Sequence, residues 1–339
     1  MHFRTLRQLA EQAEAAGLSI GRYMLQEQAG ESGKTPAEEF QQMATYYGIM
    51  KDAVRRGLTE DTTSRSGLTG QDAKRILAYR GGAATPSVEV PPIAGAAPGA
   101  DASPGAKATL GAGSPPHAEA PLGAEVPPGG HTLLGDEASL AMSYALAVSE
   151  VNASMGRIIA TPTAGSCGII PGVFVSCQER FGWSDEDMTH GLFAAGAIGY
   201  VIANNSFVSG AEGGCQAEVG SAIGMAAGAL ADMRGAKPTQ AIHAVGLALK
   251  NSLGLVCDPV GGLVEVPCIV RNGFGAVTAL AAADMALAGV RSVIPSDEVV
   301  QVMLEVGTAM PDTLRETARG GLAQTPTGQQ IMKDLRKKK

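Results

Sequence analysis

Residues 210–272 read GAEGGCQAEVGSAIGMAAGALADMRGAKPTQAIHAVGLALKNSLGLVCDPVGGLVEVPCIVRN. The stretch is rich in alanine and glycine, and such small side chains let helices approach one another closely. It also carries Cys215, Cys257 and Cys268, each next to or near glycine or proline. Glycine lets the backbone approach a bulky group and proline fixes φ, so both residues can hold a side chain in a set direction. The stretch predicts closely packed helices with cysteines in the loops between them.

The remainder of the chain contains few candidate β-strands. The best are Ile169-Ile170, residues 172–175 and residues 263–266, all of them short. A doubly wound α/β protein would carry several Val/Ile-rich strands between its helices. Aromatic residues make up only 4% of the chain. The sequence therefore predicts a mainly α fold of several Gly/Ala-rich packed helices with cysteine-bearing loops.

Helical spacing of apolar residues predicts a helix over residues 3–27. A second helix should begin at Thr35, because Thr35 and Glu38 form a capping-box pattern with Pro36 at the first helical position; it should end near Gly57. Residues 64–80 predict a glycine turn that leads into a third helix. Further helices are expected over residues 134–152, 275–288 and 296–306, the last with Ser296 as its N-cap.

The composition changes abruptly between residues 81 and 131. Ten of the nineteen prolines fall between Pro86 and Pro128, and this interval contains no aromatic residue. Such a segment buries too little apolar surface to offset its ordering entropy, so we expect a disordered insertion. It separates an N-terminal helical segment, residues 1–80, from a core over residues 132–332 to which that segment belongs. A basic tail, residues 333–339, follows.

The net charge excludes some classes of partner. The chain has 26 basic and 33 acidic side chains, a formal charge of −7, which disfavours nucleic acid and anionic membranes as partners. A membrane span would need a run of about eighteen apolar residues, and the sequence has none. The N-terminus lacks the apolar core of a signal peptide. Five cysteines, an odd number, fit a reducing compartment. We expect a cytoplasmic protein.

The spacing of the three cysteines leaves two interpretations open. They are 42 and 11 residues apart, which matches neither a zinc ribbon nor a ferredoxin. Three thiolates would suit a metal or a cluster that keeps one position open for a substrate. Alternatively, all three could be inert buried side chains, since free cysteine is among the most buried residue types. Cys177 has no glycine or proline beside it and is expected to be a packing residue.

Three motifs resemble one known family. Residues 210–222 (GAEGGCQAEVGSA), 249–272 (LKNSLGLVCDPVGGLVEVPCIVRN) and 161–172 (TPTAGSCGIIPG) are similar to the alpha chain of iron–sulfur-dependent L-serine dehydratase. The likeness runs from about residue 134 to 331, and more weakly over residues 35–77. The insertion departs from the family, where continuous folded chain would be expected.

The resemblance implies a lyase that converts L-serine to pyruvate and ammonia. It implies that Cys215, Cys257 and Cys268 hold a [4Fe–4S] cluster in the core, whose open iron acts as a Lewis acid on the substrate hydroxyl. In the resembling enzymes a beta portion, fused or separate, is thought to supply a histidine to the site. No segment of this chain matches that portion, so the resemblance implies a beta chain partner, in a hetero- or homo-oligomer.

Further site candidates lie in the 161–168 loop or beside the cysteines. Hydroxyls and amides of the loop could bind a substrate carboxylate, as anion-binding nests do, although hydroxyls that cap a loop are common. The basic and amide side chains near the cysteines could bind the substrate or could equally be solvated residues on helix surfaces. The substrate-binding candidates are Thr161, Thr163, Ser166, Cys167, Asn251, Arg271 and Asn272, and the catalytic candidate is Lys250.

The location of the catalytic base and three other functions have to be considered beside this interpretation. His190 and His243 lie in apolar helical surroundings typical of core or surface histidines, so the base for α-proton removal is expected on the partner. A pyridoxal-phosphate enzyme would need a lysine motif and a glycine-rich phosphate loop, and Lys250 has neither. A cluster-dependent lyase acting on cysteine or another amino acid remains open. A non-catalytic metal protein is disfavoured, because closed structural sites use four protein ligands.

Overall fold

A computed structural model describes residues 1–81 and 132–337 of the chain. Thirteen α-helices and no β-strand occur in these residues, so the predicted mainly α fold is confirmed. None of the short candidate strands forms in this part of the chain: residues 169–175 lie in a helix, and residues 263–266 form a loop. Apart from Gly81, the predicted insertion lies outside the described residues, as do the last two residues of the basic tail.

The helices have the following bounds. They are α1 (Leu6–Ala15), α2 (Ile20–Ser32), α3 (Pro36–Thr59), α4 (Asp72–Arg80), α5 (Gly135–Ala153), α6 (Ile169–Phe181), α7 (Asp185–Asn205), α8 (Gly210–Gly213), α9 (Ser221–Met233), α10 (Pro238–Lys250), α11 (Cys268–Leu287), α12 (Ser296–Ala309) and α13 (Pro326–Lys337). Short 3-10 turns and one π-helical turn, η2 (Gln216–Gly220), lie between them.

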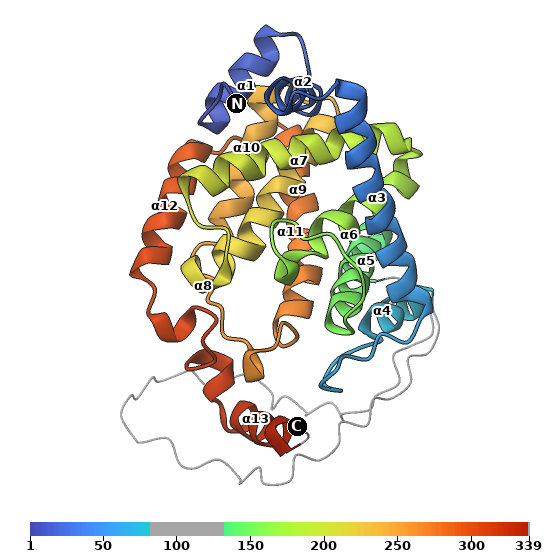
Figure 1. Cartoon of the computed structure of the whole chain (residues 1–339), viewed down its shortest axis with the longest axis vertical. Helices are drawn as coiled ribbons and strands as arrows, with labels where there is room; N and C mark the ends of the chain where they lie inside the picture. Colours follow the sequence, from blue (N-terminus) through green and yellow to red (C-terminus); the bar gives the residue numbers. More distant parts are fainter. Residues whose placement is uncertain (82–131, 338–339) are drawn as a thin grey trace, which may run out of the picture.

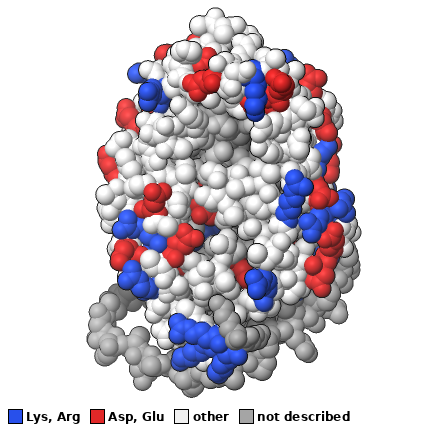
Figure 2. Space-filling model, viewed as in Figure 1, with Lys and Arg blue, Asp and Glu red and all other residues white. Residues whose placement is uncertain are grey.

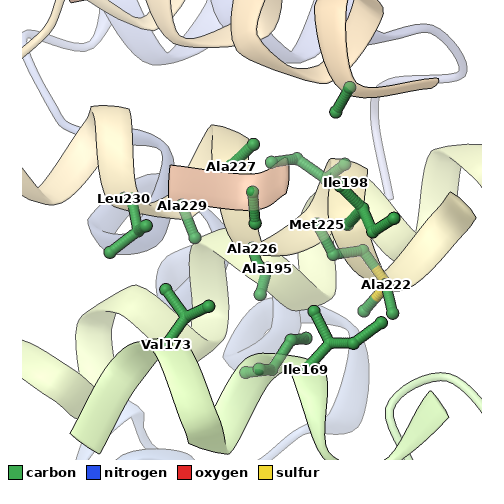
Figure 3. Packing of buried hydrophobic residues seen from close by; sticks show 14 of the residues in the cluster. Ile169, Val173, Ala195, Ile198, Ala222, Met225, Ala226, Ala227, Ala229 and Leu230 are labelled. Carbon is green, nitrogen blue, oxygen red and sulfur yellow. The ribbon is translucent and has the colours of Figure 1, made fainter. Parts of the chain in front are cut away.

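Helix α9 is the centre of the bundle. All of its residues from Ser221 to Asp232 are buried, and it packs against α6, α7, α10 and α11. In Figure 3 side chains of α9 lie among Ile169 and Val173 of α6 and Ile198 of α7. A helix that is apolar on every side must be enclosed by others, which the alanine- and glycine-rich sequence of α9 allows at close range. The cysteine-bearing loops directly precede α6, α9 and α11 in the chain.

The ends of the predicted helices agree with the structure in some places and differ in others. The capping box at Thr35 is present and opens α3. The helix expected over residues 3–27 is instead two, α1 and α2, because Gly17 adopts a left-handed φ of 67° between them. Ser296 is the first helical residue rather than the N-cap of α12; its hydroxyl donates to the carbonyl of Ile242 on α10 instead.

The N-terminal helices pack onto the body of the bundle. In Figure 1 α1 and α2 lie at one end of the molecule, and α13 lies at the opposite end. Helix α2 packs on α7, α1 on α10, and α3 and α4 on α5. Figure 2 shows side chains of both charge signs interspersed on this face, with a basic group near the end where α13 is drawn. Within the described ranges, no helix is long and apolar enough to cross a membrane.

Candidate active site

The three cysteines lie at three different element ends that meet. Cys215 follows Gly214, whose φ of 75° turns the chain out of α8, and it precedes the π-helical turn η2. Cys257 lies in the loop after α10, and Cys268 is the first residue of α11. All three are buried, with exposed fractions of 1%, 3% and 5%, and none forms a disulfide.

The three thiols influence one another directly. A hydrogen bond between Cys257 and Cys215 lowers the pKa of Cys215, aided by the nearby Arg271 guanidinium. The same hydrogen bond, with burial, raises the pKa of Cys257. Burial, followed by the negative charge of Cys215, raises the pKa of Cys268. The sequence-predicted set of cysteines is therefore brought into a single buried group.

Arg271 links the segments that carry the three cysteines. Its Nη1 atom donates to Cys215 Sγ at 3.1 Å and to the Val256 carbonyl at 2.8 Å. Its Nη2 atom pairs with Asp258 at 2.9 Å. Arg271 lies on α11 one turn after Cys268, so a single side chain links the loops that carry Cys215 and Cys257 to the helix that carries Cys268.

A segment from near the C-terminus also borders the site. The amide of Cys257 donates to the Leu314 carbonyl at 2.8 Å, and the Glu316 amide donates to the Cys257 carbonyl at 2.7 Å. Asp258 accepts a hydrogen bond from the Leu322 amide at 2.8 Å. Arg315 has a buried Nε atom with no hydrogen-bond partner among residues 1–81 and 132–337. This segment escaped sequence reasoning, because nothing local marks its contact with a loop near residue 257.

Asn272 fastens the 161–168 loop to the cysteines. Its side-chain oxygen accepts from the Gly168 amide at 2.9 Å. Its side-chain nitrogen donates to the Gly165 carbonyl at 2.7 Å and to the Cys268 carbonyl at 2.9 Å. Asn272 is 1% exposed. The buried amide thus connects the loop of hydroxyls to the first turn of α11.

Some hydroxyls of this loop have hydrogen-bond partners and one has none. Ser166 donates to the Thr161 carbonyl at 3.0 Å, and its hydroxyl lies 3.3 Å from that of Thr163. The Thr161 hydroxyl is buried and has no hydrogen-bond partner in the described part of the chain. Cys167 is fully enclosed in the hydrophobic core, and burial raises its pKa to about 12. Cys167 is thereby a packing residue in this structure, whereas Thr161 has hydrogen-bonding capacity left for a ligand.

Two of the candidate residues, Lys250 and Asn251, form no hydrogen bond with the cysteine group in the part of the chain that the structure describes. The Lys250 ammonium donates to Ser292 Oγ at 2.7 Å, in the loop before α12. Asn251 is the C-cap of α10 and is exposed. Neither residue shares a hydrogen bond with a cysteine or with the 161–168 loop within the described ranges. The structure therefore brings Arg271, Asn272 and the loop to the cysteines, but leaves Lys250 and Asn251 outside the group.

Glu218 is a site residue that sequence reasoning missed. It lies in the π-helical turn directly after Cys215 and is 6% exposed. A Cβ atom on Gly165 would lie within bonding distance of its carboxylate, so the loop backbone lies against it. Burial and, after it, the carboxylate of Glu316 raise the pKa of Glu218. An acidic residue three positions after Cys215, directly before an apolar helix, was the available signal, and π-turns often occur at functional sites.

The cysteine group fits an iron–sulfur cluster in its donor chemistry. Burial and, after it, the negative charge of neighbouring groups raise the pKa values of Glu218 and Cys268, so a positively charged core among these groups would favour their ionised forms. A Cβ atom on Gly210 would lie 3.0 Å from the Cys257 sulfur, closer than ordinary contact, so a glycine at this position lets the backbone approach the thiol. Among the described residues no three Cys, His, Asp or Glu side chains surround one ion position. Cluster thiolates bind separate iron atoms, so they need not converge on a single point.

A well-formed cavity lies elsewhere. It has a volume of about 420 Å³ and is lined by Ser176, Cys177, Phe181, Trp183, Arg234 and Asp284, among others. These residues lie toward the C-terminal ends of α6, α9 and α11, whereas the cysteine group lies where these helices begin. Cys177 therefore belongs to a different part of the molecule from Cys215, Cys257 and Cys268.

Comparison with known proteins connects this arrangement to one family. A family model described as serine dehydratase alpha chain matches residues 15–323. The Bacillus subtilis protein named "Probable L-serine dehydratase, alpha chain" is 43% identical over 98% of this chain and 95% of its own length. The L-serine dehydratase alpha chain of Peptoniphilus asaccharolyticus is 50% identical over 60% of this chain and 69% of its own. The L-serine dehydratase TdcG of Escherichia coli is 46% identical over 53% of this chain and 40% of its own. The chain belongs to the serine dehydratase alpha chain family.

Proposed function

We propose that this chain is the alpha chain of an L-serine dehydratase, a lyase that converts L-serine to pyruvate and ammonia. The names of its relatives support the reaction and the substrate. The observation that carries the proposal is the single buried group of Cys215, Cys257 and Cys268, to which Asn272 fastens the 161–168 loop. A loop of hydroxyls and amides beside three thiols suits a small polar substrate held next to a metal cluster.

Cys215, Cys257 and Cys268 would hold a [4Fe–4S] cluster as its three thiolate ligands. Three protein ligands leave one iron available to a substrate, and a bound cluster would supply a Lewis acid for the hydroxyl that leaves. Arg271 would help keep Cys215 in its thiolate form, because its guanidinium donates to that sulfur. The surrounding burial would exclude water from the reacting group, which strengthens every charge interaction there.

The other residues of the site would bind and orient the substrate. The unpaired Thr161 hydroxyl and the amides of its loop are suited to the substrate carboxylate. Arg315, whose backbone pairs with Cys257, also has a buried Nε atom without a hydrogen-bond partner in the described residues. Asn272 would not touch substrate, since its side-chain atoms are all engaged with the backbone of the loop and of α11. Its role would be to hold the loop in a fixed position relative to the cysteines.

We also propose that a beta chain completes the active site and supplies the general base. The relatives from Bacillus subtilis and Peptoniphilus asaccharolyticus are named alpha chains, which implies a further subunit. The Escherichia coli relative is longer than this chain, since 182 matched residues make up 40% of it. Its additional sequence has room for a fused counterpart. A cytoplasmic location is proposed as well, because five free cysteines suit a reducing compartment.

The proposal is tested by anaerobic reconstitution with iron and sulfide, followed by an assay of pyruvate formed from L-serine. The assay is run with and without the co-expressed beta chain, and in separate reactions L-cysteine (assayed as pyruvate) or L-threonine (assayed as 2-oxobutyrate) replaces L-serine. Pyruvate from L-serine that requires the beta chain is the expected result. A reconstituted complex that turns over L-cysteine but not L-serine would replace the substrate assignment. A complex inactive on all three amino acids would contradict the proposed function.

A further inference from the structure

Asp258 lies directly after Cys257, and its carboxylate binds two separate segments of the chain. The residue is buried, with an exposed fraction of 4%. One of its oxygens accepts from Arg271 Nη2 at 2.9 Å, and the other accepts from the Leu322 amide at 2.8 Å. The backbone of Gly321 lies so close to the same carboxylate that a Cβ atom there would overlap it. Helix α11 on one side and the C-terminal segment on the other therefore hold Asp258 in one orientation.

The ion pair with Asp258 determines which way the Arg271 guanidinium faces. A guanidinium is a rigid plane with donors on both terminal nitrogens, so fixing one nitrogen directs the other. Asp258 fixes Nη2, and Nη1 donates to Cys215 Sγ at 3.1 Å and to the Val256 carbonyl at 2.8 Å. The Arg271 side chain is 15% exposed, so water competes little for these donors. The carboxylate thus aims the guanidinium at one of the three thiols.

A second carboxylate lies near enough to compete for Arg271. The charge of Arg271 also acts on the buried Glu218, although no salt bridge joins these two residues in the described part of the chain. If the Asp258 carboxylate were displaced, the guanidinium could turn toward Glu218 and away from the thiol. The position of the Asp258 carboxylate, and not its charge alone, therefore determines the contact with Cys215.

Stability alone gives little reason for a buried ion pair at this place. The cost of removing two charges from water offsets most of their attraction, so such pairs add little net stability. The Asp258–Arg271 pair differs from an isolated one, because the same guanidinium also donates to a sulfur. A donor with a full positive charge stabilises negative charge on that sulfur. The pair is thus suited to act on the sulfur of Cys215.

The second oxygen of Asp258 fixes a segment near the C-terminus. Two backbone hydrogen bonds join Cys257 to residues 314 and 316, at 2.8 and 2.7 Å. The hydrogen bond from the Leu322 amide to Asp258 is the third. Together they attach residues 314–322 to two consecutive residues of the cysteine loop. Displacing the Asp258 carboxylate would release the far end of this segment while the bridge to Cys257 remained.

We propose that Asp258 is a positioning residue of the site, which aims Arg271 at the sulfur of Cys215 and fixes residues 314–322 beside Cys257. The inference rests on the proposed function, because it takes Cys215 to be a cluster ligand. A hydrogen bond to a ligand sulfur stabilises the extra negative charge of a reduced cluster and so raises its reduction potential. The potential therefore reports where Arg271 points, and a merely structural role of Asp258 would leave it unchanged.

The test uses substitutions that keep every charge, in the reconstituted complex with the beta chain. Asp258→Glu adds a methylene group for which the Gly321 backbone leaves no room. Arg271→Lys replaces the guanidinium with donors on a single nitrogen, which cannot span both partners. A double variant combines the two changes. Asp312→Glu is the matched control, because Asp312 forms an exposed ion pair with Arg319 in the same part of the chain.

Three quantities are measured for each protein. They are the iron content, the reduction potential from a titration followed by electron paramagnetic resonance, and the rate of tryptic cleavage after Arg315. We expect a more negative potential in Asp258→Glu and in Arg271→Lys. The double variant should show little further change, because Asp258 acts on the sulfur through Arg271.

Cleavage after Arg315 separates the two oxygens of Asp258. It should be about tenfold faster or more in Asp258→Glu, since losing a hydrogen bond to a charged group increases local opening by that factor. Arg271→Lys should be cleaved at close to the wild-type rate, because the Leu322 amide keeps its acceptor. Asp312→Glu should match the wild type in all three measurements. Unchanged cleavage in Asp258→Glu would contradict the role of Asp258 in fixing residues 314–322.

Two results would overturn the role of Asp258 toward Arg271. One is a wild-type potential in Asp258→Glu at wild-type iron content, and the other is a double variant whose shift equals the sum of the single shifts. If Asp258→Glu takes up no iron, Asp258→Asn replaces it in the same series. Its amide nitrogen cannot accept from Arg271 or from Leu322, so one of the two contacts is lost, and additivity with Arg271→Lys again decides.

The wild-type complex distinguishes failure of this inference from failure of the proposed function. Pyruvate from L-serine together with an unchanged potential in Asp258→Glu would contradict the inference alone. A wild-type complex that holds a cluster but makes no pyruvate would contradict the proposed function, while the potentials still decide the role of Asp258. A wild-type complex that takes up no cluster would contradict both.

Discussion

At the scale of single residues, Asn251 and Asn272 show what spacing can and cannot predict. Both lie near a predicted cysteine ligand in the sequence, and both were expected to contact substrate. Asn272 is four residues after Cys268 in a helix, so it lies one turn above that cysteine and is buried. Asn251 ends α10 and is exposed. The sequence prediction began this helix at residue 275. A predicted start at residue 268 would have placed Asn272 on the same face as Cys268 and so distinguished it from Asn251.

Replacing Asn272 with alanine should destabilise the protein measurably. The change removes the acceptor for the Gly168 amide and a donor to two carbonyls in a buried place. Leaving a buried polar group without a partner costs about 1–3 kcal/mol, so we expect a loss of about 2 kcal/mol in the free energy of unfolding. Urea denaturation measures it. Asn251→Ala is the matched control and should change stability by less than about 0.5 kcal/mol; equal effects for the two variants would contradict this role of Asn272.

At the scale of elements, several helices are capped by side chains from distant parts of the chain. Asp297 accepts from the Leu6 and Arg7 amides at the start of α1. Asp232 accepts from the Ile20 and Gly21 amides of α2 at 2.8 and 3.1 Å. These carboxylates satisfy N–H groups that a helix start leaves unpaired. Sequence inspection finds local caps such as that of α3, but a cap supplied from more than two hundred residues away leaves no local signal.

The cap of α4 predicts a specific dependence of stability on pH. Glu150 of α5 is fully buried and accepts from the Asp72 and Ala73 amides, and burial raises its pKa to about 7. A carboxyl with a raised pKa holds its proton more tightly in the folded state. Its contribution is therefore complete below the unfolded pKa of about 4.5 and is lost as the pH rises toward 7.

Glu150→Gln should remove this dependence, because glutamine keeps an acceptor for the α4 amides and does not ionise. Between pH 4.5 and 7 the free energy of unfolding of the variant should gain up to about 3 kcal/mol relative to the wild type, at 1.36 kcal/mol per pH unit. Urea denaturation at a series of pH values provides the measurement. Glu11→Gln, at an exposed position of α1, is the control. Parallel profiles for Glu150→Gln and the wild type would show that Glu150 does not titrate as described.

At the scale of the whole molecule, composition predicted the fold class and motifs predicted the cysteine set. Alanine- and glycine-rich stretches indicated close-packed helices, and α9 is such a helix with every side enclosed. The rest of the site depends on tertiary contacts. Glu316 reaches Cys257 through an isolated β-bridge between Cys257 and Arg315, and Glu218 depends on a π-turn. Neither feature follows from periodicity, because both are set by how separate segments pack against each other.

Whether the three cysteines hold a cluster is decided by the iron and sulfide content of anaerobically reconstituted variants, read together with their absorption spectra. We expect Cys257→Ala, and likewise Cys215→Ala and Cys268→Ala, to lose most of the cluster, because each thiolate would bind a different iron. Cys177→Ala should retain wild-type iron content, since Cys177 lines the remote cavity at the far ends of α6, α9 and α11. Wild-type iron and absorption in folded Cys257→Ala would contradict the assignment of the three cysteines as cluster ligands.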